Sequence, residues 1–507
     1  LAEIARTTGL RIIGPNCIGI TNYLRQAAVT FMAVPQQPTA PAPHAVGVIS
    51  QSGALGFAMA LAAEHGSAIS HVLTSGNSCD VDMADYIAYL AEEPACRAIA
   101  CTFEGMADPA RLIEAAEIAR AAGKPLIVYK TAIGEAGAAA AISHTAALAG
   151  SDAAWRAAFD RAGAVVVDQF EAVMETAAFF AKAPPPKAAG IAVLATSGGA
   201  GIIAADKAEA HGVPLPQPGE ATRAVLEAHI PEFGSPRNPC DITAQVLTDP
   251  ESLTACARAL LADDQYAAML VPQVYAYAPS VRRIPVLSAL AAEAGKPVVY
   301  VWVNELWEGP GAREAEADAN IALFRSMDRC FRTLAAWVAR EERRSAGPRI
   351  PARRAPPDAA AEAARLLQAE PAGTLGERAA KSLLALYGVP VVEERLVHGA
   401  DAAVAAAGAL GWPVALKVES PDLPHKTEAG VIRLNIAPEA ELRRAYDAVL
   451  ANAAKVAARV NGVLVQPMLP PGVEIMVGAR VDPLFGPLLV VGSGGILVEL
   501  VRDAAVA

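Results

Sequence analysis

The sequence predicts an α/β protein with two doubly wound parallel-sheet domains in succession, followed by part of a smaller α+β domain. Three observations carry this prediction. Short, continuous apolar runs alternate with alanine-rich helical segments, which is typical of parallel strands covered by helices on both faces. The same strand–Ser-Gly–helix start occurs at 46–53 and again at 190–199, which indicates an internal duplication. Beyond a polar, Pro/Arg-rich span at 341–370, a hairpin-like pattern around 430–434 marks the α+β part.

The first domain follows a proline-rich joint at 35–43 and is expected over 45–182 with a flavodoxin-like fold. Ahead of the joint, Leu10–Gly19 has the pattern of a short buried strand that ends in a turn. Within the domain, strands are expected where apolar residues run without interruption, and helices where alanine dominates. The expected strands are 46–50, 71–74, 98–102 and 125–129, and the expected helices are 53–64, 82–91 and 109–121.

The second flavodoxin-like domain begins after Pro184–Pro186 and is expected over 188–340, with its first strand and turn at 190–199. We interpret 341–370 as a linker because it is polar and rich in proline and arginine. The last part is expected to mix helices with strands. Its expected helices are 377–387 and 439–458, and its expected strands are 391–392, 413–417, 462–466 and 473–477.

The composition is that of a globular protein and excludes two classes of function. The 507 residues carry a net charge of −11 and form no basic stripe, which argues against nucleic acid binding. No apolar run reaches the roughly 18 residues of a membrane helix, and no segment reads as a signal peptide. The seven scattered cysteines, without a CxxC pair, indicate reduced thiols in the cytoplasm. Because the sequence starts without Met and stops in mid-pattern, we expect a fragment.

The most informative segment is 141–152, which places His144 among small residues and hydroxyl groups. No bulky neighbour in the sequence covers the imidazole, and an Ala/Gly-rich stretch precedes it. A nitrogen nucleophile in such a loop is open to a phosphoryl donor. The alternative is a plain helix-entry loop, in which Ser143 or Thr145 caps the helix and the imidazole has no role.

Two strand-to-helix turns have the chemistry of phosphate sites. Ser52 and Gly53 follow the first strand of the first domain, and Ser197-Gly198-Gly199 occupies the same place in the second. Free backbone N–H groups and the positive end of the helix gather at such a turn. Each turn is explained equally well by a serine N-cap with glycine for close packing.

Glu104 follows a predicted parallel strand, at the sheet edge where ligands bind in doubly wound folds. A carboxylate at that place can hold an imidazole in one tautomer and stabilise its charged form. The alternative interpretation is a carboxylate that caps the following helix. The residue type and position alone do not decide between the two.

A group of basic residues stands in the last part of the chain. Lys417 ends a predicted strand, and the loop that follows contains His425 and Lys426. Ammonium groups that come together in this way clamp nucleotide phosphates. A single surface lysine, in contrast, is usually only solvated, so the combination is the stronger signal.

Taken together, these segments resemble the NDP-forming acyl-CoA synthetase family, the relatives of succinyl-CoA synthetase and of the ADP-forming acetate–CoA ligases. The segment 143–150 is the most specific match, and Ser50–Gly53 and Glu104 match beside it. Asn238–Asp241, with the turn at Ser197, resembles the ligase-type domain of the family. Gly492–Gly495, with several polar residues before it, resembles the first part of an ATP-grasp domain.

The resemblance implies domains and site residues. Residues 1–35 would be the C-terminal remnant of a CoA-binding domain, and 371–507 would be part of an ATP-grasp domain. His144 would be phosphorylated in turnover, with Glu104 steadying it. The implied binding residues are Asn16 and Cys17 for CoA; Ser52, Gly53, Ser197, Gly198 and Gly199 for phosphate; and Lys381, Lys417, His425, Gln466 and Glu474 for the nucleotide. The Mg²⁺ ligands of the family are expected beyond residue 507, so none is assigned.

The reaction implied by the resemblance joins a small carboxylic acid to CoA and converts ATP to ADP and phosphate, through phosphohistidine and acyl-phosphate intermediates. The sequence does not distinguish acetate from a branched or an aromatic acid. Two alternatives stay open: a family member that couples acyl-CoA formation to a lyase step, and a non-catalytic regulatory module that binds CoA and nucleotide. We expect a cytoplasmic homodimer with no nucleic acid or membrane partner.

Overall fold

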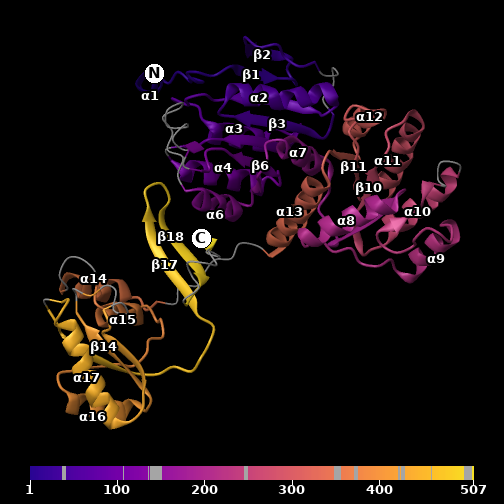
Figure 1. Cartoon of the computed structure of the whole chain (residues 1–507). Helices are drawn as coiled ribbons and strands as arrows, with labels where there is room; N and C mark the ends of the chain where they lie inside the picture. Colours follow the sequence, from indigo (N-terminus) through magenta and orange to yellow (C-terminus); the bar gives the residue numbers. More distant parts are fainter. Residues whose placement is uncertain are drawn as a thin grey trace. The chain divides into compact units, whose positions relative to one another are not determined.

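The computed structural model describes most of the chain, and its residues group into two compact units. The first unit comprises Leu1–Pro348 and Ile475–Ala507, and the second comprises Arg349–Glu474 (Figure 1). No helix in the part of the chain that the structure describes is both long and apolar enough to cross a bilayer. The described residues are 1–36, 42–106, 108–134, 136–137, 151–244, 249–346, 355–369, 375–420, 423, 429–457, 459–495 and 505–506.

A seven-stranded sheet forms the first domain of the first unit, in the order β2-β1-β4-β3-β5-β6-β7. The strands from β3 to β7 pair in parallel, as the uninterrupted apolar runs predict. Every residue of β3 and β4 is buried. The strands are β1 (Gly19–Asn22), β2 (Ala27–Thr30), β3 (Ala45–Ser50), β4 (Ile69–Thr74), β5 (Cys96–Phe103), β6 (Leu126–Lys130) and β7 (Val165–Val167).

Helices cover both faces of this sheet, which confirms the doubly wound fold. α2 and α7 bury Phe57 and Phe179 against one face. α3, α4 and α6 bury Ile87, Leu112 and Trp155 against the other. The helix expected at 53–64 is shorter than predicted, because its last turn tightens into the 3₁₀ helix η1. The helices are α2 (Gly53–Ala60), η1 (Leu61–His65), α3 (Met83–Glu92), α4 (Pro109–Ala121), α6 (Asp152–Ala162) and α7 (Ala172–Lys182).

The second domain repeats this topology. Its five-stranded sheet has the order β12-β11-β10-β8-β9, which matches β7-β6-β5-β3-β4 strand for strand. All neighbouring strands in it pair in parallel. Its elements are β8 (Gly190–Ala195), α8 (Gly198–Ala210), α9 (Glu220–His229), β9 (Cys240–Asp241), α10 (Pro250–Ala262), β10 (Tyr266–Gln273), η3 (Ala278–Arg282), α11 (Arg283–Ala294), β11 (Val298–Trp302), α12 (Ala312–Ala317), β12 (Ile321–Phe324) and α13 (Met327–Ala346).

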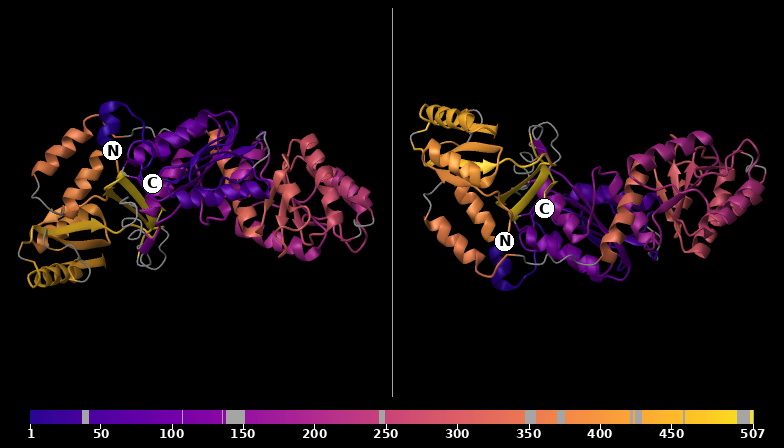
Figure 2. Two further views of the ribbon diagram at one scale, coloured as in Figure 1. Left: turned by 90° about the horizontal axis from the view of Figure 1, so that it is seen from above. Right: turned by 90° about the horizontal axis from the view of Figure 1, so that it is seen from below.

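One hydrophobic core runs through both domains of the first unit, which lie side by side (Figure 2). Phe179 of α7 packs edge-on against Trp337 of α13, with ring centroids 5.3 Å apart. In the same interface, the buried carboxylate of Glu175 accepts two hydrogen bonds from the Arg329 guanidinium, at 2.7 and 2.9 Å. Breaking a buried bidentate pair would leave an uncompensated charge, so this pair fixes α7 against α13.

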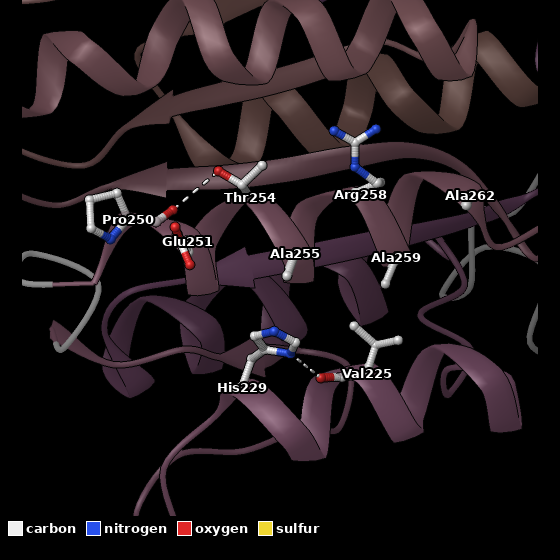
Figure 3. Close-up of a pocket in the computed structure, with 9 residues that line it drawn as sticks. All are labelled: Val225, His229, Pro250, Glu251, Thr254, Ala255, Arg258, Ala259 and Ala262. Carbon is white, nitrogen blue, oxygen red and sulfur yellow. Dashed lines mark hydrogen bonds between the residues drawn. The ribbon is translucent and has the colours of Figure 1, made fainter.

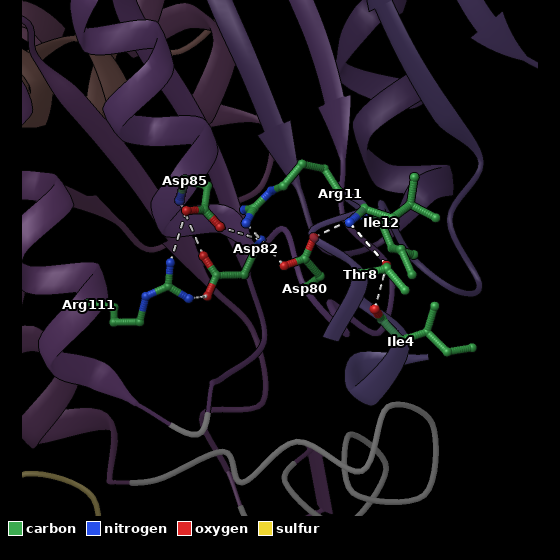
Figure 4. A network of polar contacts seen from close by, with 9 residues as sticks. Ile4, Thr8, Arg11, Ile12, Asp80, Asp82, Asp85 and Arg111 are labelled. Atoms are coloured by element: carbon green, nitrogen blue, oxygen red, sulfur yellow. Dashed lines mark hydrogen bonds and ion pairs between the residues drawn. The ribbon is translucent and has the colours of Figure 1, made fainter. Parts of the chain in front are cut away.

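The N-terminal segment docks on the first domain and does not form the buried strand expected at Leu10–Gly19. It begins with α1 (Ala2–Thr8), and Leu10 is 60% exposed. The prediction is wrong because positive φ angles at Gly14 and Asn16 turn the chain. The Asp80 carboxylate accepts the Ile12 N–H at 2.8 Å within a wider network of ionic groups (Figure 4). The extended part comes later, as the hairpin of β1 and β2 at the edge of the sheet.

A four-stranded antiparallel sheet, in the order β13-β16-β14-β15, forms the core of the second unit with α16 and α17. Residues 391–392 are not a strand, contrary to expectation, since the pairing begins at β13. Part of the expected linker 341–370 is helical, because its alanine-rich end favours helix. The elements are α14 (Ala359–Ala369), α15 (Glu377–Leu386), β13 (Arg395–Val397), α16 (Ala400–Leu410), β14 (Val414–Glu419), β15 (Ile432–Ile436), α17 (Glu439–Ala453) and β16 (Gly462–Pro467).

The last strands form an antiparallel hairpin that belongs to the first unit. At its turn, the Phe485 ring packs edge-on against Trp155 of α6, with centroids 4.7 Å apart. The strand expected at 473–477 is β17, which starts two residues later than predicted and extends to Asp482. The strands are β17 (Ile475–Asp482), β18 (Gly486–Ser493) and β19 (Ala505–Val506).

Gly76 tests the docking of the N-terminal segment. It has a φ of +56°, and an added Cβ would lie 2.4 Å from the carbonyl oxygen of Pro15, whereas Gly123 has a φ of +73° and open space around it. Gly76→Ala forces two backbones apart and should lower the Tm by about 5 °C or more. Gly123→Ala adds only backbone strain and should lower it by about 3 °C or less. Equal shifts in differential scanning calorimetry would contradict the docking.

Candidate active site

The strand order reverses at the carboxyl ends of β3 and β5, and we call this place on the sheet edge the crevice. β3 lies between β4 and β5. The strand that follows β3 in sequence, β4, is added at one edge of β3, and the next strand, β5, is added at its other edge. α2, after β3, and α4, after β5, cover opposite faces. Loops diverge at such a reversal, and ligands bind there in open parallel sheets. Ser50 ends β3 and Glu104 follows β5, so two predicted segments meet at this edge.

The side chain of Gln51 joins the two turns across the crevice. Its Oε1 accepts the N–H groups of Glu104 and Gly105, at 2.6 and 3.1 Å. Its Nε2 donates to the carbonyl oxygen of Gly105 at 2.7 Å. Beneath it, the hydroxyl groups of Ser50 and Thr102 bond to each other at 2.6 Å. These bonds fix the distance between the turn after β3 and the turn after β5.

Ser52 and Gly53 have the geometry of a helix N-cap, as the structural alternative expects. The Ser52 hydroxyl accepts the Leu55 N–H at 3.4 Å. A Cβ on Gly53 would lie 2.4 Å from the Ile18 side chain, so close packing requires glycine there. The other N–H groups in the first turn of α2 have no partner within the helix and suit an anion. Capping and phosphate binding are therefore compatible at this turn.

Glu104 and Lys130 bring opposite charges to the same edge. Lys130 ends β6 and is 2% exposed, and its Nζ donates to the carbonyl oxygens of Glu104 and Thr131, at 2.6 and 2.5 Å. Burial lowers the pKa of Lys130 to about 8, against the opposing effects of Asp152 and Glu104. The Oε2 atom of Glu104 is buried without a hydrogen-bond partner among the described residues. Such an oxygen is ready to accept a donor from a ligand or a mobile side chain.

Asp152, at the start of α6, carries a second such oxygen. Its Oδ2 accepts the Arg156 Nε–H at 2.8 Å, and its Oδ1 is buried with no partner in the described part of the chain. Because Asp152 acts electrostatically on Lys130, the start of α6 lies near Glu104. His144 lies outside the described residues, together with the rest of 138–150, and its role stays a prediction.

The matching turn of the second domain is built differently. Ser197 is the N-cap of α8 but makes no capping hydrogen bond, and Gly198 and Gly199 are exposed. A Cβ on Gly198 would lie 3.0 Å from the Asp241 carboxylate, which therefore approaches the start of α8. A carboxylate there competes with an anionic ligand for the same N–H groups. This turn belongs to the other sheet and does not join the crevice residues.

Asn16 and Cys17 lie in the docked N-terminal turn. Asn16 has a φ of 57°, and its amide donates to Asn77 Oδ1 at 3.2 Å. Cys17 is half-buried and its thiol is free. Because Asn77 follows β4, which pairs with β3, this turn stands at the same sheet edge as Ser52.

In the second unit, three predicted nucleotide-binding residues converge on two carboxylates. Glu377 accepts hydrogen bonds from Lys381, Lys417 and Gln466, at 2.8, 2.9 and 3.0 Å. Glu394 accepts from Lys381 and Gln466, both at 2.6 Å. Two ammonium groups thus meet at one partly exposed place, held by an α15 carboxylate.

The other two predicted nucleotide-binding residues do not join this cluster. Glu474 is exposed, and the described residues give it no hydrogen bond or ion pair. His425 lies outside the described residues. Within the described ranges, no group of three or more His, Cys, Asp and Glu side chains could hold a metal ion, so no residue is assigned to Mg²⁺.

A groove between α9 and α10 is separate from the predicted site (Figure 3). Its lining is largely apolar and contains none of the predicted residues. Its polar groups are engaged within the protein: His229 Nδ1 bonds with the Val225 carbonyl at 2.9 Å, the Thr254 hydroxyl with the Pro250 carbonyl at 3.1 Å, and the Arg258 guanidinium with Glu293 of α11 at 2.6 Å. The groove therefore offers little directional chemistry to a polar substrate.

Five side chains gain a role only from the structure: Gln51, which lies within the predicted turn Ser50–Gly53, Asp152, which ends the segment 141–152, and Lys130, Glu377 and Glu394. Lys130 carries a signal in the sequence, since it ends the apolar run of β6 at the binding edge of the sheet. The carboxylates of the second unit have no such signal. Glu377 and Glu394 are far apart in the sequence and resemble ordinary surface residues, because only the sheet brings them to Lys417 and Gln466.

Comparisons with known proteins agree with this architecture. A family model for the succinyl-CoA ligase like flavodoxin domain matches residues 43–180, and one for the ATP-grasp domain matches residues 366–507. A trans-feruloyl-CoA synthase from an unidentified prokaryote is 30% identical, over 99% of this chain and 71% of its own. An ADP-forming acetate–CoA ligase from Archaeoglobus fulgidus is 31% identical, over 100% of this chain and 72% of its own.

A third relative is the ADP-forming 4-hydroxybutyrate–CoA ligase of Nitrosopumilus maritimus, 29% identical over 99% of this chain and 72% of its own. Among solved structures, the dinucleotide-forming acetyl-CoA synthetase of Ca. Korarchaeum cryptofilum, in complex with phosphate and ADP, has a TM-score of 0.59 and 28% identity. That match covers 68% of this chain and 74% of the other. This chain belongs to the family of ADP-forming acyl-CoA ligases, which are acid–thiol ligases.

Proposed function

We propose that this protein converts a small carboxylic acid, ATP and CoA into acyl-CoA, ADP and phosphate, with His144 as the phosphoryl carrier. The observation that carries the proposal is the crevice between β3 and β5, where the start of α2, an unpartnered Glu104 oxygen and the buried Lys130 ammonium come together. The match to the succinyl-CoA ligase like flavodoxin domain covers this crevice.

The proposed reaction consists of three transfers. First, an imidazole nitrogen of His144 attacks the γ-phosphorus of ATP, and a P–N bond forms as the P–O bond to ADP breaks. Second, a carboxylate oxygen of the acid attacks this phosphorus, which frees the imidazole and gives an acyl phosphate. Third, the CoA thiolate attacks the acyl carbon, a C–S bond forms, and phosphate leaves. Each transfer joins a good donor to a positioned nucleophile.

In this proposal the crevice residues orient the imidazole and hold the phosphoryl group. The Oε2 atom of Glu104 accepts an N–H of His144, which selects the tautomer whose other nitrogen is the nucleophile. The N–H groups at the start of α2, after Ser52 and Gly53, hold the phosphoryl oxygens. The Gln51 bonds support this assignment, because they keep Glu104 at a fixed distance from that helix.

His144 is close enough in the chain to reach the crevice. Seven residue steps separate it from Ser151, a span of roughly 24 Å at full extension. Ser151 directly precedes Asp152, which acts electrostatically on Lys130. This tether supports delivery of the imidazole to Glu104.

The nucleotide is assigned to the second unit. The ATP-grasp match covers Lys381, Lys417 and Gln466, whose side chains meet at Glu377. Ammonium groups clamp phosphates by charge and by hydrogen bonds, and Glu377 keeps both of them extended toward one place. We place His425 and Glu474 in the same site, and Asn16 and Cys17 in the CoA site, as the family resemblance implies.

The relatives reported above are named as ligases or as a synthase, which supports the ligase reaction over the lyase-coupled and regulatory alternatives. Their names carry different acids, so the acid here is left open. A coupled CoA-consumption screen over short, branched and aromatic acids identifies it.

We also propose that the protein is cytoplasmic and forms a homodimer. The seven cysteines are all free, as expected in a reducing compartment. Analytical ultracentrifugation tests the dimer.

His144→Asn tests the carrier. The full-length protein, incubated with labelled ATP and Mg²⁺, should gain an acid-labile, base-stable label that this variant lacks, with acyl-CoA formation falling by at least about 10³-fold. His229→Asn, in the exposed α9 groove, is the matched control and should keep both. Full labelling and full activity in His144→Asn would contradict the assignment of His144 as the phosphoryl carrier.

Lys417→Met tests the nucleotide site. Removing one ammonium should weaken binding of a non-hydrolysable ATP analogue about tenfold, because a charge-assisted phosphate contact is worth about 1.5 kcal/mol or more. Lys455→Met is the control, since Lys455 is exposed and bonds only to Asn452 among the contacts described for it. Titration calorimetry that gives the same affinity for both variants would place the nucleotide elsewhere.

A further inference from the structure

We infer that Lys130 is a positioning residue for the phosphoryl transfer, which holds the Glu104 turn and offsets part of the negative charge of Glu104 and Asp152. The inference deepens the proposed function and rests on it. Neither the sequence motifs nor the family resemblance singles out Lys130.

The geometry around Lys130 is unusual for a lysine. Its side chain is 2% exposed and passes the Phe103 ring, with Nζ 5.6 Å from the ring centroid. Its ammonium donates to two main-chain oxygens, of which one belongs to Glu104 itself and the other to Thr131. Burying an ammonium destabilises the folded state unless the group is paired and hydrogen-bonded. If only packing mattered, an apolar side chain at this position would give a more stable fold.

The negative groups that face Lys130 explain the charge. Glu104 follows β5 and Asp152 starts α6, and both act electrostatically on the ammonium. Each has one buried oxygen with no hydrogen-bond partner among the described residues. Arg156 meets only the other oxygen of Asp152. Lys130 is thus a buried cation on which both carboxylates act, and each carboxylate has a buried oxygen that the described residues leave without a partner.

A second lysine, partly buried and just ahead of β6, provides the contrast. Lys124 lies before β6, at the opposite edge, and its Nζ donates to the carbonyl oxygens of Leu90 and Glu93. It therefore makes the same kind of main-chain contact as Lys130 but far from the crevice edge. A purely structural lysine predicts equal consequences at both positions, whereas a positioning role predicts an effect on the reaction only at Lys130.

The titration of Lys130 should give the transfer step a characteristic pH dependence. Burial lowers the pKa of Lys130 to about 8, and Asp152 and Glu104, the charged groups facing it, oppose that shift. Below pH 8 the ammonium is charged, and above it the charge is lost. The transfer step should therefore slow as the pH rises through about 8. Arginine stays charged throughout this range and should remove the decline.

The experiment uses the full-length protein and follows one step, transfer of the phosphoryl group from the labelled enzyme to the acid without CoA, so that no thiol titrates. Lys130→Met should lower the rate about 100-fold with an unchanged KM for the acid, as expected for a misplaced group. Lys130→Arg should keep at least about a tenth of the rate and lose the decline above pH 8. Lys124→Met should keep the wild-type rate and pH profile.

Two results would overturn the inference: a Lys130→Met rate like that of Lys124→Met, or a decline near pH 8 that persists in Lys130→Arg. If Lys130→Met does not fold, the pH profile of Lys130→Arg decides alone. A wild-type enzyme that forms no label at all would refute the proposed function instead, so the two failures are distinguishable.

Discussion

The Gln51 side chain is the contact on which the candidate site depends. Its amide bonds to both the N–H and the C=O groups of the turn after β5, and so ties that turn to the start of α2. A parallel sheet sets the carboxyl ends of neighbouring strands about 5 Å apart, but it does not fix the loops that leave them in opposite directions. Gln51 supplies that constraint and holds the turn of Glu104 next to the start of α2.

The duplicated fold shows how one topology supports different uses. Both domains have the same strand order and the same Ser-Gly start of the first helix. In the first domain, the Lys130 ammonium and the carboxylates of Glu104 and Asp152 act on one another near the crevice edge. In the second, the Asp241 carboxylate lies near the start of α8, and the buried Glu175–Arg329 pair joins the two domains. Function here follows side chains at the loops and not the sheet itself.

Much of the first unit could be predicted from the sequence, because buried parallel strands are continuous apolar runs with a strong signal. The helix 109–121 was predicted to the residue, with Pro109 at its first position. The prediction of a strand at Leu10–Gly19 was wrong, because it followed the apolar residues of this segment and missed the turn that begins at Gly14. Ser52, Gly53 and Glu104 were found as separate motifs, and the sheet brings them to one edge. Gln51 and Glu377 could not be found, since their roles come from partners distant in sequence.

Hydrogen–deuterium exchange with an acylphosphonate, a stable analogue of an acyl phosphate, tests most directly whether the crevice between β3 and β5 is the transfer site. We predict slower exchange of the Gly53 and Ala54 amides, where α2 begins, and in the turn that contains Glu104 and Gly105. We also predict no change in the amides at the start of α8, after Ser197. Protection at α8 without protection at α2 would contradict this prediction.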